Sequence, residues 1–498
     1  MADGDNALSE LGALTRKLNY SKNSWTEVKA TLERLKTWAV AKENRCMVSE
    51  TNILQMKDII TACKNSMCAQ TGELEENQLI LCLRASAEAF RFLRNCCAAT
   101  PKNQNSIASL GVIEEVLNTN VLLLKPKFQE NERASDAVND AVKSSLQLLG
   151  NTVVKNDATQ QFVWNMCFPN FFLSVLSSVN HNIQDCLCMI IYNCLNEQHR
   201  IQLVSAHDGL KMITHVIHLC AEKSQLEWGY FILDYLICNA LLPEIYKGIE
   251  FDPLARIILL DLIQVKITDA LDEPSIKLRE EHVKHGFYTD SLAYIADEFE
   301  KQAEDIIQQL QQLSPSSDDF FQVLIITRLL SVLSIGTGLQ SNLTGLQERT
   351  PLLTTCVGLL KETTNSEVKE TFSNAHSIPQ GVDSGKLSPS HGFQRDLVRV
   401  IGNMCYKHAA NQNKVRDLGG IPLLLDHCNV DDHNPFICQW AIFAIRNLLE
   451  NNKENQRIVS AMDCQGLADT SRLRELGVEA VELDNGRIKL VPIKKIHN

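Results

Sequence analysis

An asparagine recurs in this sequence at the end of apolar helical segments, where its side chain could bind the main chain of another protein. The motif is an apolar residue, a variable residue and the asparagine, and it ends at Asn95, Asn151, Asn403 and Asn447. An asparagine amide donates and accepts hydrogen bonds at once, which suits the N–H and C=O groups of an extended peptide. Arg94 and Arg446 stand beside two of these asparagines and could pair with acidic segments of a partner. These six residues are the candidate partner-binding residues.

The same asparagines also fit a role inside the protein. The last carbonyl groups of a helix lack partners within the helix, and a nearby asparagine can tie them to the next loop. This is the commoner role of asparagine at a helix end. The sequence leaves both roles open.

Two Ser-Pro pairs are candidate sites of proline-directed phosphorylation. Ser314 precedes Pro315, and Ser388 precedes Pro389. Turn formation alone also explains such a pair, because both residue types favour turns.

Metal and catalytic motifs are absent from the sequence. The chain has 17 cysteines but no Cys-x-x-Cys pair, and without a secretory signal they are expected to be reduced thiols. The cluster His427, Cys428, Asp431, Asp432 and His433 matches no established ligand spacing and is interpreted as a polar loop. No nucleophile elbow, phosphate-binding loop or zinc-protease motif occurs either. We therefore expect no enzyme activity, no cofactor and no metal.

The recurring asparagine belongs to a longer joint between two helices. Nine residues after it stands a glutamine, at Gln104, Gln160, Gln412 and Gln456. The residue before each glutamine is a predicted helix N-cap, at Asn103, Thr159, Asn411 and Asn455. A weaker fifth copy contains Asn193. Such repetition indicates a repeated structural unit.

The most complete unit lies between Phe393 and Met462 and consists of two short helices and one long helix. Gly419-Gly420 predicts a tight turn before the second helix, which is expected to begin at Pro422. Asn434-Pro435 predicts the start of the third helix. In that helix, Trp440 is expected to be buried between repeats, near Leu424, Ala444 and the helix starting at Asn455.

Three-helix units of this kind resemble armadillo repeats. The steps from Asn151 to Asn193 and from Asn403 to Asn447 are 42 and 44 residues, within the period of roughly 40–47 residues for such repeats. The predicted fold is therefore all-α, an armadillo-like α-solenoid of stacked helical repeats. The turn signal Asp484-Asn485-Gly486 adds a small C-terminal β-hairpin.

The predicted organisation has five parts in chain order. They are N-terminal armadillo-like repeats in residues 1–245, degenerate helical repeats in 246–370, a flexible loop in 371–392, C-terminal repeats in 393–476, and a tail with the hairpin in 477–498.

Composition and charge exclude several classes of protein. Hydrophobic residues make up 45% of the 498 residues and charged residues 22%, as in ordinary globular proteins. The net charge of −12 argues against nucleic-acid binding. The most apolar segments carry charges and are too short to cross a bilayer. A soluble protein without membrane insertion is expected.

The C-terminal repeats also resemble one particular family, the ataxin-10 proteins. The resemblance rests on GNMCYK, NQNKV, GGIPLLLDHCN, DDHNPF and AIRNLL between Leu397 and Leu449. It extends to FLRN with NQNSI near Asn95 and to KETTN after Leu360.

The resemblance implies a non-enzymatic protein-interaction scaffold. It implies roles in cytokinesis, and in neurite outgrowth and neuronal survival through Ras–MAP kinase signalling. The implied partners are the O-linked N-acetylglucosamine transferase, a heterotrimeric G-protein β subunit and mitotic kinases, and self-association is left open. The implied location is cytoplasmic and perinuclear, with pools at the centrosome or ciliary basal body and at the midbody.

Two other functions are carried as alternatives. An importin-like adaptor for basic peptides would carry tryptophan four residues before each asparagine, but those positions hold Arg91, Gln147, Arg399 and Phe443. An exchange factor or chaperone for a G-protein α subunit is the second alternative, and no sequence feature demands it.

Overall fold

The structure is a computed structural model that describes most of the chain, in several segments. The described residues are 8, 11, 12, 15, 25–68, 76–129, 132–178, 180–222, 226–272, 287–310, 317–339, 344–364, 390–429, 431, 434–462, 478–482 and 488–492. Their contacts divide the chain into two compact units, Met1–Leu259 and Leu260–Asn498. The five-part organisation stays a prediction. Its flexible loop lies almost wholly outside the described residues, as do Ser314 and Ser388.

The first unit is built from helices alone in the part that the structure describes. They are α2 (Trp25–Trp38), α3 (Lys42–Met47), α4 (Glu50–Cys68), α5 (Glu76–Cys97), α6 (Pro101–Ser109), α7 (Val112–Leu123), α8 (Pro126–Gln129), α9 (Ser135–Val153), α10 (Asp157–Cys167), α11 (Asn170–Leu176), α12 (His181–Cys194), α13 (Glu197–Ser205), α14 (His207–Glu222), α15 (Glu227–Cys238), α16 (Leu242–Gly248) and the start of α17 (Pro253–Asp272).

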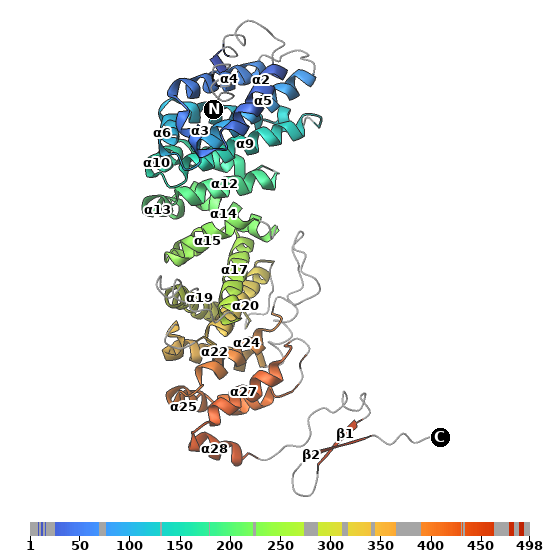
Figure 1. Ribbon diagram of the computed structural model, residues 1–498. Helices are drawn as coiled ribbons and strands as arrows, with labels where there is room; N and C mark the ends of the chain where they lie inside the picture. The colour runs from blue at the N-terminus through green and yellow to red at the C-terminus, as the bar shows by residue number, and fades with distance from the viewer. Residues whose placement is uncertain are drawn as a thin grey trace, which may run out of the picture. The chain divides into compact units, whose positions relative to one another are not determined.

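These helices form successive units of three. In the units α6–α7–α9, α10–α11–α12 and α13–α14–α15, the last helix packs against the last helix of the next unit. The helices α2, α5, α9, α12 and α15 thus form one continuous layer, and Figure 1 shows α6, α10 and α13 in a column at one edge. We call α2, α5, α9, α12 and α15 the third helices of this unit. This arrangement confirms the predicted all-α, armadillo-like fold.

The second unit continues the pattern. Its elements are α19 (Phe287–Leu310), α20 (Ser317–Gly336), the 3-10 helix η1 (Leu346–Glu348), α22 (Thr350–Thr364), α24 (Phe393–Met404), α25 (Ala409–Asp417), α26 (Gly420–Asp426), α27 (Ile437–Leu449), α28 (Lys453–Ser460), β1 (Val478–Glu482) and β2 (Ile488–Pro492). The third helices here are α20, α24 and α27, which pack side by side. The strands β1 and β2 pair antiparallel, with Val478 opposite Pro492, which confirms the predicted hairpin.

Aromatic packing holds the core of the first unit together around Trp164 of α10. Its side chain is only 1% exposed. The rings of Phe168 and His199 stack on it with centroids 5.1 and 4.4 Å away, and the indole N–H donates to Gln202 Oε1 at 2.8 Å. A buried indole needs such a polar partner. Through α10 and α13 this cluster joins two successive repeats.

The complete C-terminal repeat differs from the prediction at two helix starts. Gly419 adopts the predicted left-handed conformation with φ of 73°, but α26 already begins at Gly420, ahead of Pro422. The third helix α27 begins at Ile437 rather than at Asn434-Pro435, and its N-cap is Phe436 with φ of 66°. Asn434 Oδ1 instead accepts the backbone N–H of Gln394 at 3.1 Å, across to α24. A tertiary contact has replaced the local cap.

Candidate functional site

The four recurring asparagines form the same hydrogen bond in both units. In each case the side-chain amide donates to a backbone carbonyl in the last turn of the preceding third helix. The pairs are Asn95 to Lys36 (3.0 Å), Asn151 to Arg94 (3.0 Å), Asn403 to Ser334 (3.2 Å) and Asn447 to Gly402 (2.8 Å). These bonds satisfy carbonyl groups that a helix end leaves unpaired. The amide donor therefore already serves the joint, and a role in partner binding remains a proposal.

The residues predicted as N-caps lie three residues inside their helices. Asn103, Thr159, Asn411 and Asn455 each donate to the carbonyl seven residues earlier, at 3.0, 2.6, 2.8 and 2.9 Å. The true N-caps are three residues upstream, and the side chains of Asn156, His408 and Asn452 accept the expected hydrogen bond there. The prediction of the caps was wrong because a polar residue at either position can satisfy a helix end.

The true caps also connect neighbouring repeats. Asn156 Nδ2 donates to Gln104 Oε1 at 3.0 Å and to Asn105 Oδ1 at 2.9 Å. Asn452 Nδ2 makes the matching pair of bonds to Gln412 and Asn413, at 3.2 and 2.9 Å. The sequence did contain a signal for these caps, since each cap stands five residues after a recurring asparagine. The joint is a repeated polar network that sets how one repeat stacks on the next.

The candidate arginine Arg94 is engaged within the first unit. Its Nη1 donates to Gln147 Oε1 on α9 at 2.7 Å, and its Nε lies 3.3 Å from Asn95 Oδ1. Burial, together with the positive charge of Arg91, lowers the pKa of Arg94. Beside it a chain of ion pairs crosses α2, α5 and α9, because Glu88 pairs with Lys36 and with Arg91, both at 2.6 Å, and Arg91 pairs with Asp140.

Arg446, the other candidate arginine, differs from Arg94 in its surroundings. It lies exposed on α27, and among the described residues its guanidinium has no ion-pair or hydrogen-bond partner. It stays the more accessible of the two arginines. Of the six candidate residues, three belong to joints in the first unit and three to joints in the second: Arg94, Asn95 and Asn151, and Asn403, Arg446 and Asn447.

Trp440 is only half-buried, which corrects the prediction that it is buried between repeats. The guanidinium of Arg399 on α24 lies over its ring, 4.6 Å from the centroid, and Phe443 meets it edge-on at 5.6 Å. Burial lowers the pKa of Arg399. The long arginine side chain packs on the face of Trp440 and attracts its π-electrons. The sequence showed an apolar stripe but not this neighbour from another helix.

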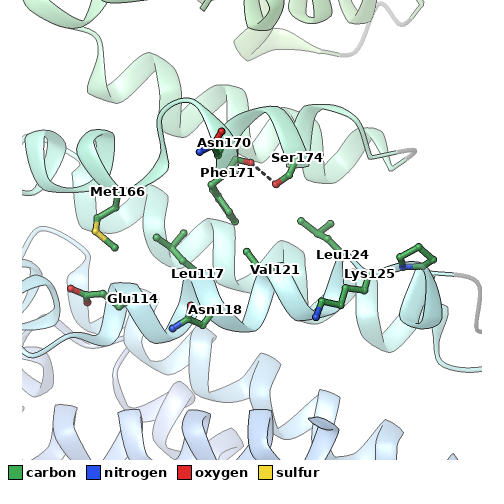
Figure 2. Close-up of a pocket in the computed structure, with 11 residues that line it drawn as sticks. Glu114, Leu117, Asn118, Val121, Leu124, Lys125, Met166, Asn170, Phe171 and Ser174 are labelled. Carbon is green, nitrogen blue, oxygen red and sulfur yellow. Dashed lines mark hydrogen bonds between the residues drawn. The ribbon is translucent and has the colours of Figure 1, made fainter. Parts of the chain in front are cut away.

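An open pocket of about 660 Å³ lies between α7 and α11 in the first unit. Figure 2 shows Met166 and Glu114 toward one end and Leu124 and Lys125 toward the other. Apolar side chains form its floor, and two of them are well exposed, Val121 at 53% and Met166 at 42%. The polar lining residues are Asn118, Asn170 and Ser174, and the charged ones are Glu114 and Lys125. An apolar concavity with a few polar groups is the usual form of a binding site.

A second feature that sequence reasoning missed is a group of four aromatic rings on two third helices. Tyr192 lies at the end of α12, and Trp228, Phe231 and Tyr235 lie along α15. The signal on α15 was their spacing of three and four residues, which places them on one helical face. Tyr192 comes from another repeat, and no local pattern connects it to them.

Comparisons with known proteins give the family. Residues 393–491 match the model described as the spinocerebellar ataxia type 10 protein domain. Ataxin-10 of Xenopus tropicalis is 34% identical over 413 residues, covering 82% of this chain and 81% of the relative. The chain belongs to the ataxin-10 family. Human ataxin-10 is 32% identical over 447 residues, covering 88% of this chain and 89% of the human protein.

A solved structure from a study of the interaction between cadherin and β-catenin aligns over 90% of this family member and 92% of that chain. It is 10% identical and its TM-score is 0.27. Such a score carries no argument, so the armadillo-like fold rests on the arrangement of the helices described above.

The described part of this ataxin-10 family member has neither a metal site nor a disulfide bond among its His, Cys, Asp and Glu residues. It contains no group of three or more His, Cys, Asp and Glu residues that could hold a metal ion, although Asp432 and His433 lie outside it. Its sixteen cysteines are free thiols. Burial raises the pKa of Cys97 and of Cys194 to about 12, so both stay protonated at neutral pH.

None of the described helices of this family member is by itself both long and apolar enough to span a membrane. The helices α6 and α7, which meet at 67°, reach that length and apolar composition only together.

Proposed function

We propose that this ataxin-10 family member is a non-enzymatic scaffold that binds partner proteins through its stacked helical repeats. The observation that carries the proposal is the pocket between α7 and α11. Its exposed Val121 and Met166 sit beside the more buried Leu117 and Phe171, which form the floor. An apolar surface that stays accessible and is bordered by polar groups is typical of a protein-interaction site.

Family membership supports a more specific role, which is part of the same proposal. The protein would act in cytokinesis, and in neurite outgrowth and neuronal survival through Ras–MAP kinase signalling. Its partners would be the O-linked N-acetylglucosamine transferase, a heterotrimeric G-protein β subunit and mitotic kinases. It would act in the cytoplasm and perinuclear region, with pools at the centrosome or basal body and at the midbody. Ser314 and Ser388 remain candidate phosphorylation sites in this proposal.

The two alternative functions gain less support. An importin-like adaptor would need neutral aromatic positions before the asparagines, but Arg91 joins an ion-pair chain and Arg399 covers Trp440. Both positions are cationic and would repel a basic peptide. For a G-protein exchange factor, the described residues offer no specific contact surface that distinguishes it from a general scaffold.

The proposal is tested by binding of the full chain to purified partners, the transferase and the G-protein β subunit, each immobilised in turn. We expect the double variant Val121→Asp with Met166→Asp to lose at least tenfold in affinity for at least one partner, because carboxylates would replace the exposed apolar side chains of the pocket. The matched control is Val40→Asp, at a valine that is 61% exposed and lies outside the pocket. Equal binding by the pocket variant and the control, for both partners, would contradict the proposal.

A further inference from the structure

The aromatic rings of α12 and α15 form a compact cluster around Tyr192. The ring centroid of Tyr192 lies 5.7 Å from Trp228, 5.8 Å from Phe231 and 6.4 Å from Tyr235. Trp228 and Phe231 meet edge-on at 5.5 Å. We call these four residues the aromatic cluster. Their mutual contacts fix the ring orientations, so the exposed ring surfaces are held in place before any partner arrives.

The aromatic cluster remains accessible, unlike the core aromatics of the same unit. The side chain of Phe231 is 40% exposed, whereas that of Trp164 is 1% exposed. Tyr192, Trp228 and Tyr235 are each half-buried. Large aromatic side chains that keep part of their surface open on a rigid helix are the residues that anchor partners most often.

Negative charge surrounds the aromatic cluster. The helices α12 and α15 contain no lysine or arginine, while they carry Asp185, Glu227 and Asp234. Asp185 Oδ1 accepts the backbone N–H of Trp228 at 3.4 Å, which places this carboxylate at the edge of the cluster. Lys143 of α9 is the one cation that acts on Asp185, and Arg200 of α13 is bonded to Asn239 beyond the end of α15. The carboxylates of Asp185 and the exposed Glu227, on either side of the Trp228 backbone N–H, favour a cation at this edge of the cluster.

In the second unit an aromatic ring already binds a cation of the chain itself. The guanidinium of Arg399 covers the ring of Trp440. Among the described residues no lysine or arginine lies over the rings of the aromatic cluster. Aromatic faces attract a cation through the negative charge of their π-electrons, and arginine stacks on them with its planar group.

We propose that the aromatic cluster binds an arginine side chain from an extended segment of a partner protein. The guanidinium stacks on the open face of Phe231, next to the edge-on Trp228, and the carboxylates of Asp185 and Glu227 balance its charge. This inference rests on the proposed scaffold function and adds to it the chemistry of one binding site. It concerns a single cation site and not the run of basic residues that an importin-like adaptor would bind.

The test uses the full chain and a dye-labelled peptide with the sequence Gly-Ser-Arg repeated three times. Fluorescence anisotropy at near-physiological salt measures its affinity. A second peptide carries citrulline in place of each arginine, which keeps the planar shape and removes the charge. We expect the citrulline peptide to bind at least tenfold more weakly. Equal binding of the two peptides, or no binding of the arginine peptide, would overturn the proposal.

Variants separate stacking from general attraction to an acidic protein. Phe231→Leu keeps an apolar side chain without a ring and is expected to weaken arginine-peptide binding about tenfold, while Asp185→Asn weakens it several-fold. Phe251→Ala is the matched control, because Phe251 is 57% exposed in the same unit but outside the aromatic cluster. Circular dichroism checks that each variant is folded. If Phe231→Leu binds like the control, the proposal is wrong.

Failure of this site and failure of the scaffold function give different results. If the arginine peptide does not bind but the Val121→Asp, Met166→Asp variant still loses its partners, only the aromatic-cluster proposal fails. If the pocket variant binds its partners normally, the scaffold proposal loses its supporting observation whatever the peptide does.

Discussion

At the scale of single residues, the recurring asparagines are structural first. Asn447 is 2% exposed, and its amide donates to the Gly402 carbonyl at 2.8 Å. Asn151 makes the same bond to Arg94 in the other unit. Because the bond joins two third helices, an asparagine at this position fixes the spacing of neighbouring repeats. Any contact that these side chains make with a partner must use the second amide N–H or the carbonyl oxygen, and in Asn95 that oxygen already accepts a hydrogen bond from Arg94.

Replacing Asn447 with alanine should therefore destabilise the C-terminal repeats. The Gly402 carbonyl would lose its donor in a buried place, at a cost of about 1–3 kcal/mol. Urea denaturation followed by circular dichroism measures the change in the free energy of unfolding. Arg446→Ala is the control, since the exposed neighbour should change it by less than about 0.5 kcal/mol. Equal losses in both variants would show that the hydrogen bond has no special role.

His199 makes a second residue-scale prediction, which concerns pH. Its buried ring stacks on Trp164, and burial lowers its pKa below the ordinary value of about 6.5. The unfolded chain then binds more protons than the folded chain below about pH 6.5, so stability falls as the pH drops through that value. The stability that the neutral His199 side chain contributes is fully present above about pH 6.5. This stability decreases as the pH falls from there to the lowered pKa of the folded state, and it changes no further at lower pH.

Thermal unfolding at several pH values between 7.5 and 5 tests this pH dependence. We expect His199→Gln to lose less of its stability on acidification than the wild-type chain does, because it cannot take up the proton. The exposed His207 provides the control variant, His207→Gln. If wild type and His199→Gln respond to acid in parallel, the assigned role of His199 is incorrect.

At the scale of helices, the contact between α24 and α27 depends on Trp440 and Arg399. Trp440→Ala should cost less than the ~3–5 kcal/mol of a fully buried aromatic residue, because Trp440 is half-buried. It would also leave the partly buried guanidinium of Arg399 without its ring. Hydrogen exchange should show lost protection confined to the C-terminal repeats, α24 to α28, since repeat proteins couple mainly nearest neighbours.

The control for this helix is Ile442→Ala, because Ile442 is 58% exposed on α27. It should leave hydrogen exchange nearly unchanged. Loss of protection in α5 or α9 of the first unit after Trp440→Ala would contradict nearest-neighbour coupling.

The sequence predicted this level of structure well where the signal was local and repeated. The joint after Asn95, Asn151, Asn403 and Asn447 could be read because each copy uses the same residues at the same spacing. The caps were assigned to the wrong residues, because Asn156 and Thr159 are both polar and both satisfy backbone groups.

Contacts between distant residues set the limit of prediction. The exposure of Trp440 depends on Arg399 from another helix. The aromatic cluster depends on Tyr192, which lies in the repeat before α15. The pocket depends on α7 and α11 in successive repeats. In each case the two segments that meet are far apart in the sequence and share no local sequence pattern.

At the scale of the whole molecule, both proposed binding features lie in one of the two units. The pocket and the aromatic cluster both belong to the first unit, on different helices of the repeats. The family-specific domain match, residues 393–491, belongs to the second unit. Variants at the pocket or at the aromatic cluster should therefore leave the stability of the second unit intact.

The most direct test of the central claim is hydrogen exchange of the full chain with and without each proposed partner, the O-linked N-acetylglucosamine transferase and the G-protein β subunit. We predict that at least one of them protects α7 and α11, around Val121 and Phe171, and that Val121→Asp with Met166→Asp abolishes this protection. Protection of α7 and α11 by neither partner at saturating concentration would contradict the claim that the first unit binds partners through its pocket.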